Sequence, residues 1–305
     1  MTDHQRTSTA GGIEVSELTR RYGEVLAADR VSFTVPPGTM TGFVGANGAG
    51  KTTTMRMIVG VLAITSGSVS FNGHPITAAD RRGIGYMPEE RGLYPKQPIV
   101  DQLVYLARIR GVSAQAAQQQ TMSYLERFGL ADRAKDKVET LSLGNQQRVQ
   151  VTAALLGSPV ALILDEPFSG LDPMAVDAMA EVLREASSSG VPVLFSSHQL
   201  DLVERLCDRL VILSGGRVVA QGSTDELRGS GPRRHRLCAD TDLGWLRSAR
   251  GVDVVDLGGT TAVLEFTEPG ADQAVLAEAL RRGEVTEFSR IVPTLSEIYR
   301  EAAAS

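Results

Sequence analysis

The sequence predicts an α/β fold organised around a phosphate-binding loop, and three observations support this prediction. Residues 45–52, Gly-Ala-Asn-Gly-Ala-Gly-Lys-Thr, fit the pattern G-x-x-x-x-G-K-[ST] of such a loop. Residues 160–164 form a continuous apolar run, typical of a buried parallel strand, that ends in two acidic residues. Short apolar strands alternate with helical patterns along most of the chain, which favours a parallel sheet covered by helices.

Composition limits the possible functions before any motif is considered. The 305 residues, 42% of them hydrophobic, are enough for one large or two ordinary domains. A net charge of -5 argues against a general nucleic-acid binder. Cys207 and Cys238 give neither a disulfide framework nor zinc spacing, so we interpret them as small buried residues. Residues 1–12 are polar and are predicted to be a disordered tail. No window approaches the ~20 apolar residues of a membrane span, so we expect a membrane role only through a partner.

The first predicted elements are strands at residues 13–18 and 31–35, joined through a turn that contains Tyr22. An aromatic ring near a phosphate loop can stack on a purine base; packing at the strand end is the alternative for Tyr22. Residues 40–44 then form a strand and residues 53–59 a helix. This strand and helix are the flanks that a phosphate-binding loop requires.

The loop itself predicts that the chain binds a nucleoside triphosphate. Its glycines let successive backbone N–H groups point at one anion, and the helix after it adds positive potential. Lys51 would reach the β and γ phosphates, and the Thr52 hydroxyl would hold Mg2+. The alternative is a glycine-rich turn that matches by chance, expected in about one such chain in a hundred. The predicted binding residues are Gly45, Asn47, Gly48, Ala49, Gly50, Lys51, Thr52 and Thr53.

The middle of the chain is expected to add two strands and several helices. They are a strand into a turn at 66–73, a strand at 84–87, a charged loop at 88–95, and helices at 100–110, 113–128 and 141–156. Ser142 is placed to be the N-cap of the last helix. Its hydroxyl and the neighbouring N–H groups form a second possible anion site, with an ordinary helix start as the alternative.

Two acidic residues follow the apolar strand at residues 160–164. Asp165 would bind Mg2+ through its water shell, and Glu166 would polarise a water for in-line attack on the γ-phosphate. An exposed acidic turn is the alternative. After a helix that ends near residue 188, a strand at residues 191–195 leads to His198. This is where such an architecture collects active-site side chains, although a structural histidine is the alternative. A hairpin across residues 214–217 follows.

Composition shifts at residues 228–232, which we interpret as a linker. The elements predicted beyond it are strands at 236–239, 252–257, 262–266 and 285–291, and helices at 243–249 and 271–282. Their order, βαββαβ, predicts a small ferredoxin-like α+β domain. Thr294 and Glu297 form a capping box for a last helix. The basic run at 233–236 could touch acidic lipid or a partner, and a solvated charge run is the alternative.

Taken together, residues 13–227 resemble the ATP-binding cassette (ABC) ATPases. The segment Leu-Ser-x-Gly-x-x-Gln-Arg at residues 141–148, upstream of the strand that ends in Asp165 and Glu166, is the most specific feature. The resemblance implies a P-loop NTPase of ABC type, with a RecA-like core, a β subdomain and a helical signature subdomain. We therefore expect an ABC domain at residues 13–228 and the accessory α+β domain at 229–305.

The resemblance also implies roles for single residues. Two cassettes would pair head to tail as a homodimer, with each ATP between one chain's phosphate loop and the other chain's Ser142 and Gly144. Asp165 would serve the metal and Glu166 would be the general base. The remaining implied roles are adenine stacking by Tyr22, γ-phosphate contact by His198 together with Lys51, and a link between the two sites by Asp172.

One position departs from the family pattern. Where the family usually has Gln in the loop after Ile-Gly-Tyr-x-Pro, this chain has Glu89, which we expect to orient water or Mg2+. The run Pro-Glu-Glu-Arg-Gly-Leu-Tyr-Pro at residues 88–95 resembles the subgroup that serves ABC-2-type permeases, including sodium-extrusion and drug-export systems. In the family, the region corresponding to Glu90 to Arg110 receives the membrane subunit.

These resemblances predict an ATP-hydrolysing subunit of an exporter, bound at the cytoplasmic face of the membrane to a separate permease. Sodium, a drug or antibiotic, and a lipid or polysaccharide all remain possible substrates. The alternative is a soluble ABC ATPase that acts on ribosomes or DNA. Ribosome-associated members usually carry two cassettes and DNA-repair members a long coiled coil before the signature, whereas only residues 53–140 lie there in this chain.

Overall fold

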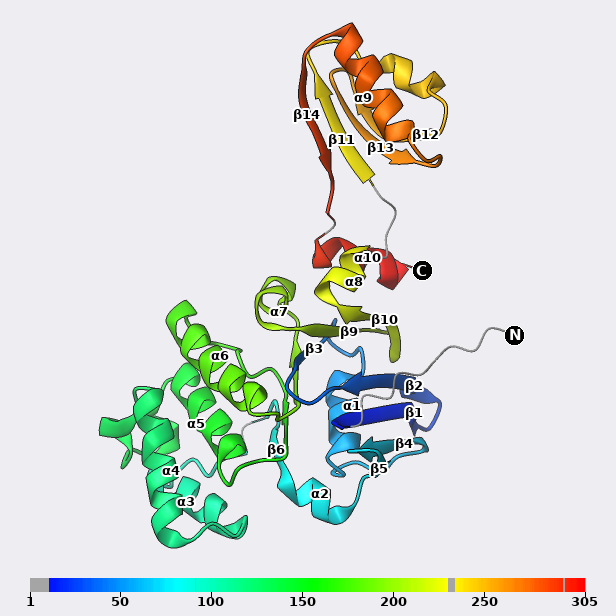
Figure 1. Ribbon diagram of the computed structural model, residues 1–305. Coiled ribbons are helices and arrows are strands. Elements are labelled where there is room, and N and C mark those ends of the chain that lie inside the picture. Colours follow the sequence, from blue (N-terminus) through cyan, green and yellow to red (C-terminus); the bar gives the residue numbers. More distant parts are fainter. Residues whose placement is uncertain (1–10, 91, 230–233, 293, 305) are drawn as a thin grey trace. The chain divides into compact units, whose positions relative to one another are not determined.

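The computed structural model describes residues 11–304, apart from 91, 230–233 and 293. The chain divides into two compact units, the first ending at Thr224 and the second beginning at Asp225 (Figure 1). Most of the predicted N-terminal tail, residues 1–10, lies outside the described residues. The predicted linker at 228–232 needs a correction, because Arg228 and Gly229 belong to helix α8, Thr224–Gly229, and 230–232 lie outside the described residues.

A six-stranded sheet with the order β10-β9-β3-β8-β7-β6 forms the centre of the first unit. Strands β6 to β9 and β3 pair in parallel, and β10 adds an antiparallel edge. Every residue of β3, β7 and β8 is buried, as their apolar sequences predict for central strands. The strands are β3 Met40–Gly45, β6 Ile84–Met87, β7 Ala161–Leu164, β8 Val193–Ser197, β9 Arg209–Ser214 and β10 Arg217–Ser223.

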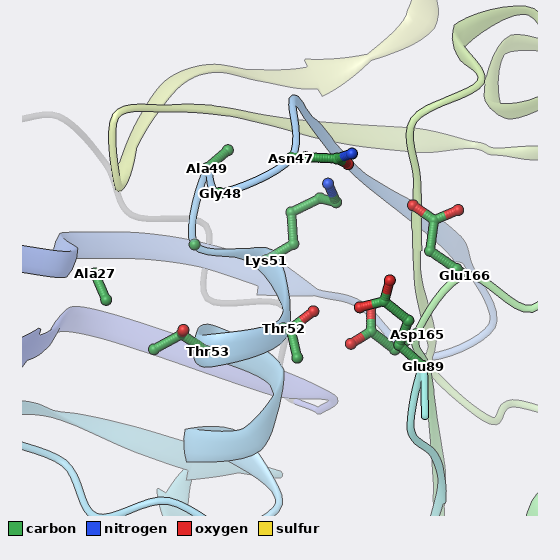
Figure 2. Close-up of a pocket in the computed structure, with 11 residues that line it drawn as sticks. Ala27, Asn47, Gly48, Ala49, Lys51, Thr52, Thr53, Glu89, Asp165 and Glu166 are labelled. Carbon is green, nitrogen blue, oxygen red and sulfur yellow. The ribbon is translucent and has the colours of Figure 1, made fainter. Parts of the chain in front are cut away.

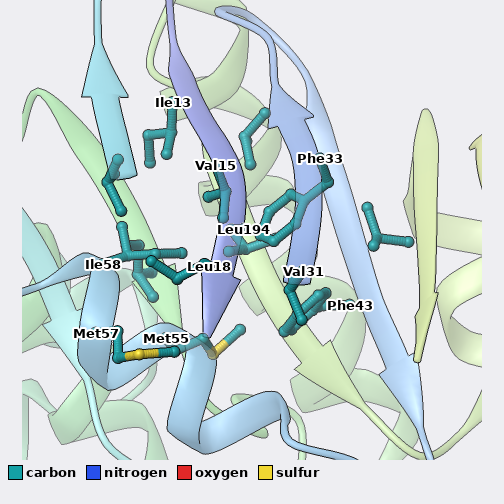
Figure 3. Close-up of a cluster of buried hydrophobic side chains, with 14 of the residues drawn as sticks. Ile13, Val15, Leu18, Val31, Phe33, Phe43, Met55, Met57, Ile58 and Leu194 are labelled. Atoms are coloured by element: carbon teal, nitrogen blue, oxygen red, sulfur yellow. The ribbon is translucent and has the colours of Figure 1, made fainter. Parts of the chain in front are cut away.

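A second, antiparallel sheet with the order β2-β1-β4-β5 belongs to the same unit. Its strands are β1 Ile13–Tyr22, β2 Val25–Val35, β4 Ser66–Phe71 and β5 His74–Pro75. Alternate side chains of β1 and β2, among them Val15 and Phe33, pack against helix α1, Lys51–Ile58, in one apolar cluster (Figure 3). The Phe33 ring lies 5.0 Å from that of Phe43 on β3, which joins the two sheets. This core fixes the base of the phosphate-binding loop.

Helices account for most of the rest of the first unit. They are α2 Ala78–Gly83, α3 Ile99–Ile109, α4 Ala114–Arg127, α5 Leu143–Leu155, α6 Pro173–Ser188 and α7 Leu200–Leu206, with short 3-10 turns at Ala131–Arg133 and Val138–Thr140. Helices α3, α4 and α5 contact one another and form a group beside the central sheet (Figure 1). The mainly parallel sheet, the antiparallel sheet and this helical group correspond to the predicted RecA-like core, β subdomain and helical signature subdomain. The short helices α2 and α7 were not predicted.

The second unit has the expected βαββαβ order and the sheet order β12-β13-β11-β14, which is the ferredoxin-like arrangement. Its elements are β11 Arg234–Ala239, η3 Gly244–Ser248, β12 Val252–Gly258, β13 Thr261–Phe266, α9 Ala271–Arg282, β14 Val285–Arg290 and α10 Leu295–Ala304. The segment predicted as its first helix, residues 243–249, is instead the 3-10 turn η3, the tighter helix that proteins use in such short connecting pieces. The predicted capping box is present, since Glu297 accepts from the Thr294 N–H at 2.8 Å and donates its own N–H to the Thr294 hydroxyl at 3.3 Å.

No helix within the described residues is long and apolar enough to cross a membrane.

Candidate functional site

The phosphate-binding loop joins β3 to α1 and depends on two glycines with left-handed backbone. Gly48 has φ +81° and Gly50 has φ +100°, conformations that L-amino acids with a Cβ rarely adopt. A Cβ at Gly50 would lie only 2.4 Å from the Ala27 carbonyl oxygen on β2. Gly50 thus brings the start of α1 against the neighbouring sheet. Gly50 also occupies the N-cap position without a capping side chain, which leaves the first N–H groups of α1 suited to bind an anion.

Lys51 is held by the loop that it belongs to. Only 8% of its surface is exposed, and its ammonium donates to the carbonyl oxygen of Gly45 at 2.7 Å and to that of Ala46 at 3.3 Å. A buried ammonium that lies among the backbone N–H groups of such a loop is the arrangement that stabilises bound phosphate. Helix α1 begins at Lys51, two residues earlier than predicted, so Lys51 and Thr52 belong to its first turn.

A cavity of about 350 Å³ lies over the loop and brings it together with the predicted acidic residues. The phosphate loop and α1 form one side of this cavity, and three acidic side chains from other elements face them (Figure 2). The lining residues are Ala27, Asn47, Gly48, Ala49, Gly50, Lys51, Thr52, Thr53, Glu89, Asp165 and Glu166. The predicted loop residues, the metal candidates and the predicted base are therefore assembled in one place, with the exception of Gly45, whose carbonyl instead holds Lys51.

Asp165 is almost fully buried at the end of β7, with 1% of its surface exposed. Its Oδ1 atom accepts a hydrogen bond from the Ser196 hydroxyl at 2.5 Å. Its Oδ2 atom is also buried and has no hydrogen-bond partner among the described residues. A buried carboxylate oxygen without a donor is costly in the absence of a cation, so the donor set fits Mg2+. No group of three or more His, Cys, Asp and Glu side chains suited to a metal occurs in the described part of the chain, so Mg2+ here would depend on phosphate oxygens and water as further ligands.

Glu166 has an unusual backbone, with φ +53°. Three hydrogen bonds hold its peptide groups: its N–H donates to the Ser196 hydroxyl at 2.8 Å, and its carbonyl accepts from Gln147 Nε2 at 2.7 Å and from the Ser169 N–H at 3.2 Å. Its carboxylate lies 3.0 Å from His198 Nδ1. Non-glycine residues with such backbone cluster at functional sites, because the surrounding structure must hold them there.

Besides Gly45, five predicted residues do not line this cavity: Tyr22, Ser142, Gly144, Asp172 and His198, of which His198 instead contacts the lining residue Glu166. Ser142 is the N-cap of α5, as predicted, and accepts from the Asn145 N–H at 3.4 Å. Gly144 lies close to the loop that precedes α6, because a Cβ there would be 3.0 Å from the Gly170 carbonyl oxygen. Asp172 caps α6 by accepting from the Ala175 N–H at 2.9 Å. These three residues form a second region at the N-termini of α5 and α6.

Tyr22 lies at the end of β1, in the turn to β2, and is not part of the cavity lining. The residue is 47% exposed, and the guanidinium of Arg20 lies 4.5 Å from the centroid of its ring. The ring is therefore accessible on the surface of the first unit, and its stacking on adenine stays a prediction.

Sequence reasoning missed three residues that shape the site. Ala27 supplies the carbonyl against which Gly50 packs, Gln147 binds the Glu166 carbonyl, and Ser196 binds both acidic residues. Gln147 lies inside the signature segment, which could have marked it. Ser196 had no such signal, because the strand was predicted to end at residue 195 although β8 continues to Ser197.

Comparisons with known proteins agree with this geometry. A family model described as "ABC transporter" matches residues 28–169, and one described as "ATP-binding protein DrrA1-3-like, C-terminal domain" matches residues 222–303. The chain is 41% identical to an uncharacterized ABC transporter ATP-binding protein, YhaQ, of Bacillus subtilis (strain 168), over 95% of this chain and 97% of that protein. It is 37% identical to the Nod factor export ATP-binding protein I of Burkholderia orbicola (strain AU 1054), over 70% of this chain and 72% of that protein. A solved structure of an ATP-binding subunit of an ABC transporter, 35% identical, covers 72% of this chain and 92% of its own with a TM-score of 0.67.

Proposed function

This chain belongs to the family of ABC transporter ATP-binding proteins, and from that premise we propose that it energises export through a separate membrane permease. Members of this family bind and hydrolyse ATP, and this chain is an ATPase. The observation that carries the ATP-hydrolysing part of the proposal is the assembly of Lys51, Asp165 and Glu166 around one cavity. The name of the Nod factor export relative supports the direction of transport. Sodium, a drug or antibiotic, and a lipid-type molecule are the substrate classes that we propose.

The residues around the cavity have different roles in ATP hydrolysis. Lys51 and the loop N–H groups bind and orient the phosphates, and Glu166 accepts a proton from the attacking water. His198, 3.0 Å from the Glu166 carboxylate, orients that carboxylate and contacts the γ-phosphate. Mg2+ would be held by Thr52, Asp165 and Glu89, all of which line the cavity, and would neutralise charge on the transferred phosphate.

The second region supports a dimeric site. Ser142, Gly144 and Asp172 do not line the cavity over the loop of their own chain. The N-terminus of α5 offers backbone N–H groups to an anion, which is the chemistry that a γ-phosphate requires. We propose that a second, identical chain presents Ser142 and Gly144 to the ATP bound at the first, with Asp172 joining the two sites. Tyr22 would stack on the adenine.

The permease would bind the surface of residues 90–110. Tyr105 and Ile109, one turn apart on α3, are 60% and 64% exposed there, so they offer a partner two adjacent apolar side chains. A permease on this surface would hold the chain at the cytoplasmic face of the membrane. The rival proposal, a soluble ABC ATPase acting on ribosomes or DNA, predicts no membrane partner.

A pull-down separates these proposals. Tagged Glu166→Gln protein is purified from detergent-solubilised native membranes with ATP and Mg2+, because a variant that binds but does not hydrolyse ATP holds the closed complex. The control is Lys51→Ala, which should not retain ATP. A polytopic membrane protein enriched only with Glu166→Gln supports export, and its identity narrows the substrate. Enrichment of ribosomes or DNA, or of a soluble dimer alone, contradicts export. Normal ATP turnover by Glu166→Gln would contradict the proposed base.

A further inference from the structure

We propose that Ser196 is a positioning residue that sets the geometry of both acidic residues at once. The inference rests on the roles proposed for Asp165 and Glu166. Ser196 does not itself line the cavity, and its hydroxyl reaches the cavity only through its hydrogen bonds to Asp165 and Glu166, which do line it.

The hydroxyl of Ser196 lies between the two acids and is hydrogen-bonded to both. Ser196 has 0% of its surface exposed. Its O–H donates to Asp165 Oδ1 at 2.5 Å, and its oxygen accepts the Glu166 N–H at 2.8 Å. A serine hydroxyl has a single proton, and here it points at Asp165. The lone pairs of the oxygen are therefore free to accept the Glu166 N–H. One buried oxygen therefore joins a side chain and a main-chain group of consecutive residues.

The bond to Asp165 determines which carboxylate oxygen is available to a cation. Because Oδ1 is held by Ser196, Oδ2 is left buried without a partner among the described residues. Groups that hydrogen-bond a ligating carboxylate orient it and usually affect metal affinity or activity by 10- to 100-fold. Without the hydroxyl, the carboxylate could rotate and offer either oxygen.

The bond to Glu166 holds its left-handed backbone. With φ +53°, this residue adopts a conformation that an L side chain disfavours, and a fixed partner on each side of the residue is needed to maintain it. Ser196 holds the N–H, and Gln147 holds the carbonyl. The direction of the Glu166 side chain, which brings its carboxylate to His198, follows from this backbone.

The register of the sheet explains why Ser196 occupies this place. Strands β7 and β8 are parallel and adjacent, and Leu164 pairs with Phe195. The next residue of β8 therefore lies beside Asp165 and Glu166, directly after the end of β7. The neighbouring Ser197 is 3% exposed but points to the opposite face of the strand, where its hydroxyl accepts the Gln199 N–H at 3.0 Å. Ser197 thus provides a matched control.

The test compares Ser196→Ala, Ser196→Cys and Ser197→Ala in the full chain. For Ser196→Ala we expect kcat for ATP to fall 10- to 100-fold and the Mg2+ concentration for half-maximal activity to rise about tenfold. Affinity for ATP in EDTA should stay within about twofold, because the phosphate loop is unchanged. Ser196→Cys keeps a weak donor and should give an intermediate kcat. Ser197→Ala should keep kcat within about twofold of the parent.

Two results would overturn the inference. One is that Ser196→Ala and Ser196→Cys both have the same kcat and the same Mg2+ dependence as the parent chain. The other is a loss of ATP affinity, measured in EDTA, that equals the loss of kcat, which would indicate general disruption of the fold. Glu166→Gln, assayed in parallel, separates this inference from the site proposal. If Glu166→Gln is inactive and Ser196→Ala is normal, only the positioning role of Ser196 fails. If Glu166→Gln keeps normal turnover, the proposed base itself fails.

Discussion

The contact of Gly50 with Ala27 can be tested by a pair of alanine substitutions in the phosphate loop. Gly48 and Gly50 both have left-handed backbone, so a Cβ is disfavoured at each. Nothing lies within 4 Å of the position that a Cβ would take at Gly48, whereas at Gly50 the Ala27 carbonyl oxygen lies 2.4 Å away. The two variants therefore share the cost of a left-handed backbone, and only Gly50→Ala adds a steric clash with the Ala27 carbonyl oxygen.

The magnitudes follow from these two terms. Left-handed backbone costs a residue with a Cβ about 1–2 kcal/mol, which is the whole effect expected for Gly48→Ala. Overpacking against a fixed backbone adds about 1–3 kcal/mol for Gly50→Ala. In a unit of this size, each kcal/mol lowers Tm by about 2–4 °C. We therefore expect Gly50→Ala to melt roughly 2–12 °C below Gly48→Ala.

The assay is thermal unfolding of both variants and the parent chain without nucleotide, followed by circular dichroism and checked by urea unfolding. Measurement without nucleotide is needed because bound ATP would stabilise each variant according to its affinity. Equal Tm values for the two variants, or a lower value for Gly48→Ala, would refute the argument. The carbonyl of Ala27 would then move aside at little cost, and the start of α1 would not be held by β2.

Three further predictions follow from single side chains. Thr41→Val should raise the free energy of unfolding by about 1 kcal/mol, because the buried Thr41 hydroxyl has no partner among the described residues. Thr152→Val should lower the free energy of unfolding by a similar amount, because the Thr152 hydroxyl donates to the Arg148 carbonyl of the same helix at 2.9 Å. Urea unfolding in which both variants change the free energy in the same direction would contradict this. Gln147→Leu should lower kcat about tenfold by freeing the Glu166 carbonyl, and a steady-state assay with unchanged kcat would contradict it. Cys207 is only partly buried as a residue, but desolvation of its thiol raises the pKa well above its usual value. The thiol therefore stays protonated at pH 8 and should react with iodoacetamide at least about tenfold more slowly in the native chain than in urea, as peptide mapping would show; equal rates would contradict this.

The sequence was most informative where glycine, proline and apolar runs mark the elements. Helix α9 and strand β6 have the bounds that were predicted, and the phosphate loop could be identified with its flanking strand and helix. The order of the strands could not be read from these local patterns. It is this order, with β3, β8, β7 and β6 adjacent, that brings Glu89, Asp165 and Glu166 to one cavity.

The support around the acids shows why local patterns fall short. Ser196 follows an apolar strand, and polar residues at such a place usually indicate a loop. It remains in the strand because its backbone pairs with Phe43 of β3, and its hydroxyl finds a partner in Asp165, which lies 31 positions earlier in the chain. A partner so distant in sequence leaves no periodic signal. In the same way, the local pattern of a polar helix start does not show that Gln147 reaches the Glu166 carbonyl, although its place in the signature segment could have marked it.

The two backbone bonds of the Lys51 ammonium have a consequence for affinity. A free lysine side chain samples many rotamers, and ordering it costs about 1.5–2 kcal/mol. Here Gly45 and Ala46 already hold the ammonium, so that entropy is lost when the chain folds and not when a ligand arrives. A triphosphate therefore binds to a lysine that is already ordered. The entropy cost of ordering Lys51 lowers the stability of the fold and does not lower the affinity for the nucleotide.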